Sequence, residues 1–224
     1  MMTIVFLQIM VYYVTMNYRD YKTNFEGGYF HDLNRGANKQ QIFFEKSDFQ
    51  RFTDLMSEAF LGEKSENSSR KCLPAGSYNL LVYAQMPNHF HFIVKQNTEI
   101  PVGVAMKKIQ GGYAKFFNTK YKRSGGVFED QFKHIDIDSD IYLRWVIGYV
   151  LLNPYLAGLE NNFGDYPYSS LHDLLWYRTN KLTNSEFVMD LFDGKDKLIS
   201  FLNMAALEIK NRKDLQKYLL DHNL

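Results

Sequence analysis

The chain has 224 residues, of which 46% are hydrophobic and 23% are charged, so it is long enough for one globular domain with a full core. Its 26 Lys and Arg residues almost balance its 25 Asp and Glu residues, for a formal net charge of +1. The molecule as a whole is therefore no polycation, and any surface that binds nucleic acid must be local. One cysteine, Cys72, excludes an internal disulfide and fits a reducing cytoplasm.

The N-terminal segment 2–16 carries no charged residue. It lacks the basic residues and the cleavage site of a signal peptide, and it is shorter than the run of about 20 apolar residues that spans a membrane. We interpret it as the product of a start codon assigned too far upstream, with synthesis beginning at Met16, or as an extra edge strand. Both interpretations leave the protein soluble.

The first elements after this segment are short. Residues 29–33 are typical of a strand that ends in the turn Asn34-Arg35-Gly36, and residues 41–44 are a candidate second strand. Ser47 or Asp48 can cap a helix whose apolar residues recur at helical spacing, namely Phe49, Phe52, Leu55, Met56 and Phe60.

A hairpin follows, with strands at 78–85 and 89–94 joined by a tight turn at Pro87-Asn88. Residues two apart share one face of a strand, about 6.6 Å from each other, so His89 and His91 lie side by side while Phe90 and Phe92 face a core. The two imidazoles are either the polar face of a half-buried strand or two ligands of a metal site that needs a third.

Next comes a helix that starts after Pro101 and has a basic second half. The span 107–123 contains no acidic residue and is interleaved with Tyr113 and Tyr121. Its six cations are Lys107, Lys108, Lys115, Lys120, Lys122 and Arg123. The span is a candidate phosphate-binding surface, and the alternative is an ordinary solvated helix face.

A further helix begins near Ile141, capped by Asp138 or Ser139. Tyr149 and Asn153 are four residues apart, so both point the same way and could face the two histidines. Pro154 disfavours helix at the preceding residue, which predicts that the helix ends at Asn153. Three short amphipathic helices are expected in the tail, at 185–192, 197–207 and 213–220.

Met-Pro-Asn-His-Phe-His at 86–91, followed by Tyr-x-x-x-Asn-Pro at 149–154, resembles the REP-associated tyrosine transposases, a branch of the single-tyrosine HUH (His-hydrophobic-His) nucleases. Segments 29–36, 127–133 and 166–170 resemble the family in the same order. The resemblance divides the chain into an N-terminal extension at 1–26, a transposase domain at 27–175 and a helical C-terminal tail at 176–224.

The resemblance implies an α+β fold, with helices packed on an antiparallel sheet in a ferredoxin-like topology. It implies that Tyr149 attacks the scissile phosphate of single-stranded DNA near a hairpin, leaving a 5′-phosphotyrosine bond and a free 3′-hydroxyl. His89 and His91 carry over as metal ligands, with Asn153 as the third. The expected cofactor is Mg²⁺ or Mn²⁺, because mixed nitrogen and oxygen donors suit Mg²⁺ less well than an all-oxygen shell would. We expect no small-molecule cofactor, no membrane partner and a monomer or homodimer.

The expected DNA-binding residues are the six cations of 107–123, together with Asn34, Arg35, Gln131 and Lys133. Two departures from the family stand out: Gln131 occupies a position where relatives often have Arg, and the first motif reads His31-Asp32-Leu33 where they favour an apolar residue. Neither departure is expected to touch the chemistry.

Two other functions remain open from the sequence. A domesticated relative would bind hairpin DNA without cutting it, although a pure binder has no need of His89, His91, Tyr149 and Asn153 together. An unrelated hydrolase would use the two histidines to hold zinc and would attack with water, leaving Tyr149 as core packing.

Overall fold

The structure, a computed structural model, describes residues 24–63, 72–129, 131–176 and 182–211. The N-terminal segment 2–16 and the helix expected at 213–220 lie outside these ranges. Among the helices described, none combines the length and the apolar composition that a membrane span requires.

The centre of the molecule is one antiparallel sheet with the strand order β2-β3-β1-β4. Its strands are β1 (Tyr29–Arg35), β2 (Tyr78–Met86), β3 (His89–Gln96) and β4 (Lys133–Ile137). β2 and β3 form the expected hairpin around Pro87 and Asn88. β3, which carries the histidine pair, therefore lies in the interior of the sheet.

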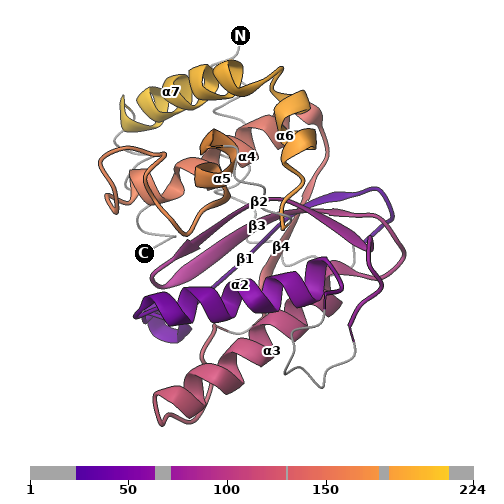
Figure 1. Cartoon of the computed structure of the whole chain (residues 1–224), viewed down its shortest axis with the longest axis vertical. Coiled ribbons are helices and arrows are strands. Elements are labelled where there is room, and N and C mark those ends of the chain that lie inside the picture. Colours follow the sequence, from indigo (N-terminus) through magenta and orange to yellow (C-terminus); the bar gives the residue numbers. More distant parts are fainter. Residues whose placement is uncertain (1–23, 64–71, 130, 177–181, 212–224) are drawn as a thin grey trace.

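Helices cover both faces of the sheet (Figure 1). On one face lie α2 (Lys46–Phe60) and α3 (Val102–Lys120), and the other face is covered by α4 (Asp140–Leu156), α5 (Ser170–Trp176), α6 (Ser185–Leu191) and α7 (Lys195–Asn211). A short 3-10 turn, η1 (Ala37–Lys39), follows β1. The α+β class and the antiparallel sheet predicted from the sequence are confirmed.

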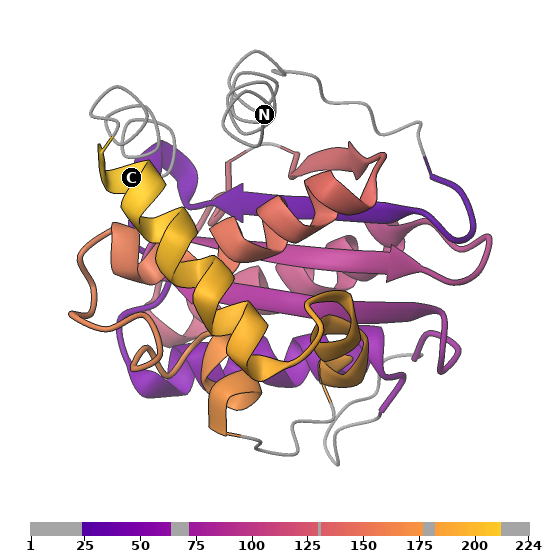
Figure 2. The same ribbon diagram turned by 90° about the horizontal axis from the view of Figure 1, so that it is seen from above.

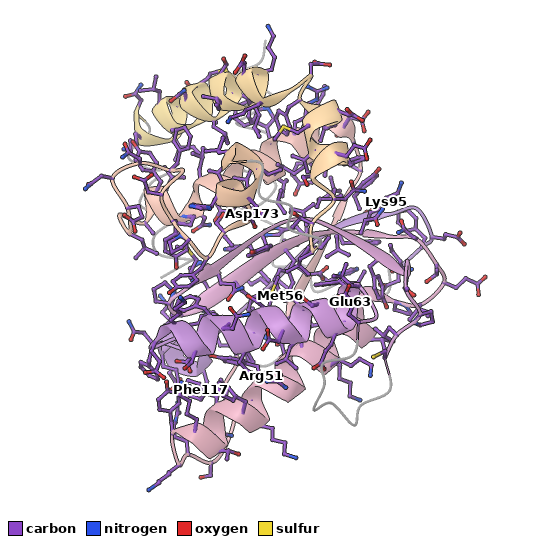
Figure 3. The ribbon with its side chains drawn as sticks, viewed as in Figure 1. Arg51, Met56, Glu63, Lys95, Phe117 and Asp173 are labelled. Atoms are coloured by element: carbon purple, nitrogen blue, oxygen red, sulfur yellow. The ribbon has the colours of Figure 1, made fainter. Side chains whose placement is uncertain are left out.

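Each face of the sheet has its own hydrophobic core. Phe90 and Phe92 of β3 pack under α2 and α3, in a core that also contains Met56 and Phe117 (Figure 3). Ile93 of β3 faces the other way, into the core beneath α4. The alternation along β3 thus separates aromatic residues from the histidines, as the sequence predicts.

Two of the predicted local details are wrong. Residues 41–44 form no strand, because Ile42 and Phe43 both donate their backbone N–H to the carbonyl of Pro87 and are buried as a loop. α2 is capped neither by Ser47 nor by Asp48: Glu45 is the N-cap residue, and the Asp48 side chain accepts from its backbone N–H in a capping box.

Two boundaries also differ. Asn34 and Arg35 are the last residues of β1 rather than part of a turn. α4 begins at the expected cap, Ser139, but continues past Asn153 to Leu156, with Pro154 inside the helix. Proline removes one backbone donor, and burial of Asn153 and Pro154 keeps the last turn in place.

The C-terminal helix α7 lies across α4 on the side away from the sheet (Figure 2). Phe201 of α7 packs edge to face against Trp145, with ring centroids 4.9 Å apart, and lies directly over Gly148. A Cβ atom at Gly148 would lie 2.6 Å from Cε1 of Phe201. The helix that carries Tyr149 is therefore held between the sheet and α7.

We expect Gly148→Ala to lower the free energy of unfolding, because overpacking a buried contact costs about 1–3 kcal/mol. Gly111→Ala on α3 is the matched control, since nothing lies within 4 Å of its added methyl group. That control should gain about 0.5–1 kcal/mol from helix propensity. Urea denaturation of both variants measures the difference, and equal stabilities would contradict the close packing of α7 on α4.

Candidate active site

β3 and α4 bring the four predicted catalytic residues together. Asn153 Nδ2 lies 3.3 Å from His91 Nε2, and the rings of His91 and Tyr149 meet edge to face with centroids 5.8 Å apart. The His89 and His91 rings are adjacent, at 5.0 Å between centroids. Strand period two and helix period four therefore place these side chains on facing surfaces, as expected. Their roles as ligands and nucleophile remain predictions.

Burial decides the charge of the histidines. His89 is 2% exposed and His91 is fully buried, and Asn153 beside them is 4% exposed. Burial lowers the pKa of His89 to about 3, and the nearby charge of Arg35 acts in the same direction. Burial also holds the pKa of His91 well below its usual range. Both imidazoles are therefore neutral at pH 7, the form in which a histidine can donate a lone pair to a metal.

The position of the proton on His89 follows from its partner. Nδ1 of His89 lies 2.6 Å from the Asn88 side-chain oxygen, which can only accept, so Nδ1 carries the proton. Nε2 then presents a bare lone pair. This atom is buried and makes no hydrogen bond to any described residue. The Asn153 side chain beside it raises the pKa of His89 against the effect of burial.

A buried lone pair without a donor is unfavourable, and a divalent cation would satisfy it. Two imidazole nitrogens and a carboxamide oxygen are a donor set that suits Mn²⁺. In the part of the chain described, no group of three or more His, Cys, Asp or Glu side chains is arranged to hold a metal. Asn153 beside the two imidazoles is therefore the candidate third protein ligand, and that role stays a prediction. The residues present fit such an ion.

The sequence interpretation missed His31. Its Nε2 lies 2.9 Å from Nδ1 of His91, and the two rings lie edge to edge with centroids 5.1 Å apart and planes 19° apart. The expectation that the His31-Asp32-Leu33 motif does not touch the proposed chemistry is therefore wrong. The missing information was the strand order: once β1 lies beside β3, the alternation of β1 turns His31 towards His91.

Asp32 faces the opposite side of the sheet. Its carboxylate lies 2.6 Å from Nδ1 of His134 on β4, and both side chains are buried. The ring of Phe30 stacks on His134 with a centroid distance of 4.4 Å. This pair joins the edge strand β4 to β1 on the face of the sheet that carries Phe92.

The basic span lies on the other face of the sheet from Tyr149, because α3 packs with α2 (Figure 1). Lys107, Lys115, Lys122 and Arg123 are exposed, and Lys108 is half-buried. Tyr113 is fully buried in the core, and the hydroxyl of Tyr121 donates to Asp48. Tyr113 therefore offers no ring face to a base, and the role of the span in DNA binding stays a prediction.

Lys120 is held within the protein. Its ammonium lies 2.5 Å from Asp48 and 2.6 Å from Glu45, at the N-terminus of α2. The Asp48 carboxylate is completely buried. Lys120 therefore compensates a buried charge, which is a structural role.

The other predicted DNA-binding residues differ in their burial and in their distance from the histidine site. Asn34 is buried and donates to Gln110 of α3 at 2.6 Å, whereas Gln131 is exposed. Arg35 sits opposite His89 in the β1–β3 register and pairs with Glu129 at 2.6 Å. Lys133 is exposed on β4, and its charge lowers the pKa values of His31 and His91. Arg35 and Lys133 are thus the predicted cations beside the site.

No protein-family model matches the sequence, and no curated protein is significantly similar to it. A solved structure described as the REP-associated tyrosine transposase bound to a REP hairpin does match. The match covers 70% of this chain and 84% of that chain, with a TM-score of 0.53 and 16% sequence identity. The likeness establishes a shared fold. The helices and the antiparallel sheet described above are arranged as in that structure.

The buried histidines predict an acid-sensitive fold. Burial lowers the pKa of His31 and of His89 to about 3, against about 6.5 in an unfolded chain. Between these values the unfolded state binds more protons, so each such histidine lowers the free energy of unfolding by about 1.4 kcal/mol per pH unit below 6.5.

We therefore expect the stability of chelator-treated protein to fall steadily from pH 7 to pH 4. Urea unfolding at a series of pH values measures the slope. In His31→Phe the slope should be smaller by the contribution of one histidine, about 1.4 kcal/mol per pH unit. A stability that stays constant over this range would contradict the burial of neutral imidazoles.

Proposed function

We propose that this protein is a metal-dependent endonuclease and strand transferase for single-stranded DNA, of the REP-associated tyrosine transposase type. The observation that carries the proposal is the meeting of Tyr149 and Asn153 on α4 with the two neutral histidines of β3. In the proposed site a hydroxyl nucleophile, two imidazole lone pairs and a carboxamide act on one phosphate. The zinc-hydrolase alternative gives Tyr149 and Asn153 no role in this arrangement.

Tyr149 is the proposed nucleophile. Its hydroxyl oxygen attacks the phosphorus of the scissile phosphodiester and gives up its proton, and the bond from phosphorus to the 3′-oxygen breaks. The 3′-oxygen leaves and takes up a proton, and the 5′-phosphate stays bonded to Tyr149. Attack by a 3′-hydroxyl reverses these steps and joins the strand to a new end. No external energy source is needed, because one phosphodiester is exchanged for another.

His89, His91 and Asn153 would hold the divalent ion through the two Nε2 atoms and the amide oxygen. When bound, the ion supplies charge stabilisation and orientation to the phosphate oxygens. Burial of the three side chains fixes their positions before the DNA arrives. Arg35 and Lys133 add positive charge beside the same phosphate.

The neighbour of similar fold is described as bound to a REP hairpin. Hairpin DNA is accordingly the proposed substrate, with the cut in a single strand beside the stem. The exposed cations of α3 lie across the sheet from Tyr149, so they cannot contact the phosphate under attack. We propose that they bind the backbone of the hairpin farther from the cut.

We expect Tyr149→Phe to abolish both cleavage and strand transfer, because the variant lacks the oxygen that forms the covalent bond. DNA binding should survive almost unchanged, since the ring remains. The measurement is incubation with a library of single-stranded hairpins and Mn²⁺, followed by a denaturing gel that retains covalent protein–DNA adducts.

Tyr142→Phe and Tyr155→Phe are the matched controls, because both tyrosines lie on α4. Each should leave the adduct nearly at the level of the unmodified protein. A covalent band from Tyr149→Phe would show that another residue is the nucleophile. Binding of hairpins by the unmodified protein without any adduct would favour the domesticated DNA-binding protein instead.

The cations of α3 can be tested through salt dependence. We expect Lys107→Ala with Lys115→Ala to weaken binding to all sequences alike and to reduce the slope of log K against log salt by about 0.7 for each lost contact. Lys120 is left intact because it compensates Asp48. Lys197→Ala, exposed on α7, is the control and should leave the slope unchanged. An unaltered slope in the double variant would assign these α3 residues to solvated surface.

A further inference from the structure

We propose that His31 is a positioning residue for the metal ligand His91. It accepts a hydrogen bond from Nδ1–H of His91, so that the lone pair of His91 Nε2 is kept facing Asn153. The proposal rests on the metal-binding role given to His91 above. It adds a residue from a third element, β1, to a site otherwise built from β3 and α4.

The two neighbours of His91 determine where its proton lies. A neutral imidazole has one N–H, and it can be on either nitrogen. The Asn153 amide nitrogen, which can only donate, is 3.3 Å from Nε2 of His91. Nε2 must then accept, and the proton is on Nδ1. The atom 2.9 Å from Nδ1 is Nε2 of His31, which therefore acts as the acceptor.

The reverse arrangement uses the same three residues. If the Asn153 amide were turned over, its oxygen would accept from Nε2–H of His91, and His31 would become the donor. His91 would then have no lone pair to offer at Nε2. The direction of this short chain of hydrogen bonds thus decides whether His91 can be a ligand at all.

In His89 the position of the proton is also fixed by hydrogen bonds, and here their direction is determined. Asn88 donates from its amide nitrogen to the carbonyl of Lys39 at 3.4 Å, which leaves its oxygen to accept from Nδ1 of His89. Nε2 of His89 is the bare lone pair. With His31 as acceptor, His91 has the same tautomer, and both lone pairs lie on the side of the site that Asn153 occupies.

β1 holds the acceptor firmly. His31 is fully buried, and its strand is paired with β3 on one side and β4 on the other. Its ring lies edge to edge with that of His91, with the planes 19° apart, and the hydrogen bond between them restrains the rotation of the ligand ring. Hydrogen-bond partners that orient a ligating histidine in this way typically change metal affinity by about 10–100-fold.

The first test reads the tautomer of His91 without any metal. Two-bond ¹H–¹⁵N correlations in protein labelled with ¹⁵N-histidine distinguish the two tautomers, and a His91→Gln spectrum assigns the resonances. We expect chelator-treated protein at pH 7.5 to carry the His91 proton on Nδ1. A proton on Nε2 would overturn the proposal, whatever the protein does with metal or DNA.

The second test compares two variants at His31. His31→Gln places an amide oxygen close to the position of the imidazole Nε2 and keeps an acceptor. His31→Phe keeps an aromatic ring and removes the acceptor. Titration calorimetry with Mn²⁺ should show about 10–100-fold weaker binding for His31→Phe and a change of no more than a few-fold for His31→Gln. Thermal melts of the metal-free proteins report on folding separately.

Mn²⁺ affinity in His31→Phe equal to that of the unmodified protein would overturn the proposal. So would equal losses in the two variants, because the acceptor would then be irrelevant. If His31→Phe does not fold, the tautomer and the His31→Gln affinity decide the matter. An unmodified protein that binds no Mn²⁺ while His91 keeps its proton on Nδ1 would contradict the proposed function but support the orientation assigned to His31.

Discussion

Burial of three uncharged imidazoles between β1, β3 and α4 is the constraint on which the site depends. Desolvation keeps His31, His89 and His91 neutral, and a neutral imidazole must place its one proton where an acceptor exists. Asn88 provides that acceptor for His89, and His31 lies at the corresponding nitrogen of His91. The nitrogens left over lie on the side of α4, where Asn153 and Tyr149 are presented. Between β3 and α4 the imidazole nitrogens thus present lone pairs, and that of His89 Nε2 has no hydrogen-bond donor among the described residues.

The rest of the fold serves to keep that interface rigid. β3 is an interior strand whose other face carries Phe90 and Phe92 into the core under α2 and α3. On its side away from the sheet, α4 packs against α7, where Phe201 leaves no room for a side chain at Gly148. A reaction that aligns a tyrosine with a phosphorus atom needs such positional accuracy from both layers.

The sequence predicted the parts of the site that depend on local periodicity. The Pro87-Asn88 turn set the hairpin, alternation placed His89 and His91 together, and helical spacing aligned Tyr149 with Asn153. What it could not predict depends on tertiary arrangement. The contribution of His31 requires β1 to lie beside β3, and the separation of the basic span from Tyr149 requires α3 to pack on the far face. Pro154 was expected to end the helix from its intrinsic preference, which tertiary burial overrides.

The most direct test of the central claim is an anomalous diffraction map from a crystal soaked in Mn²⁺. The account predicts one strong peak bounded by Nε2 of His89, Nε2 of His91 and the side-chain oxygen of Asn153, with the Tyr149 hydroxyl beside it. A peak elsewhere in the molecule would contradict it. So would a map from the soaked crystal with no peak between these three side chains and with the side chains directed away from one another.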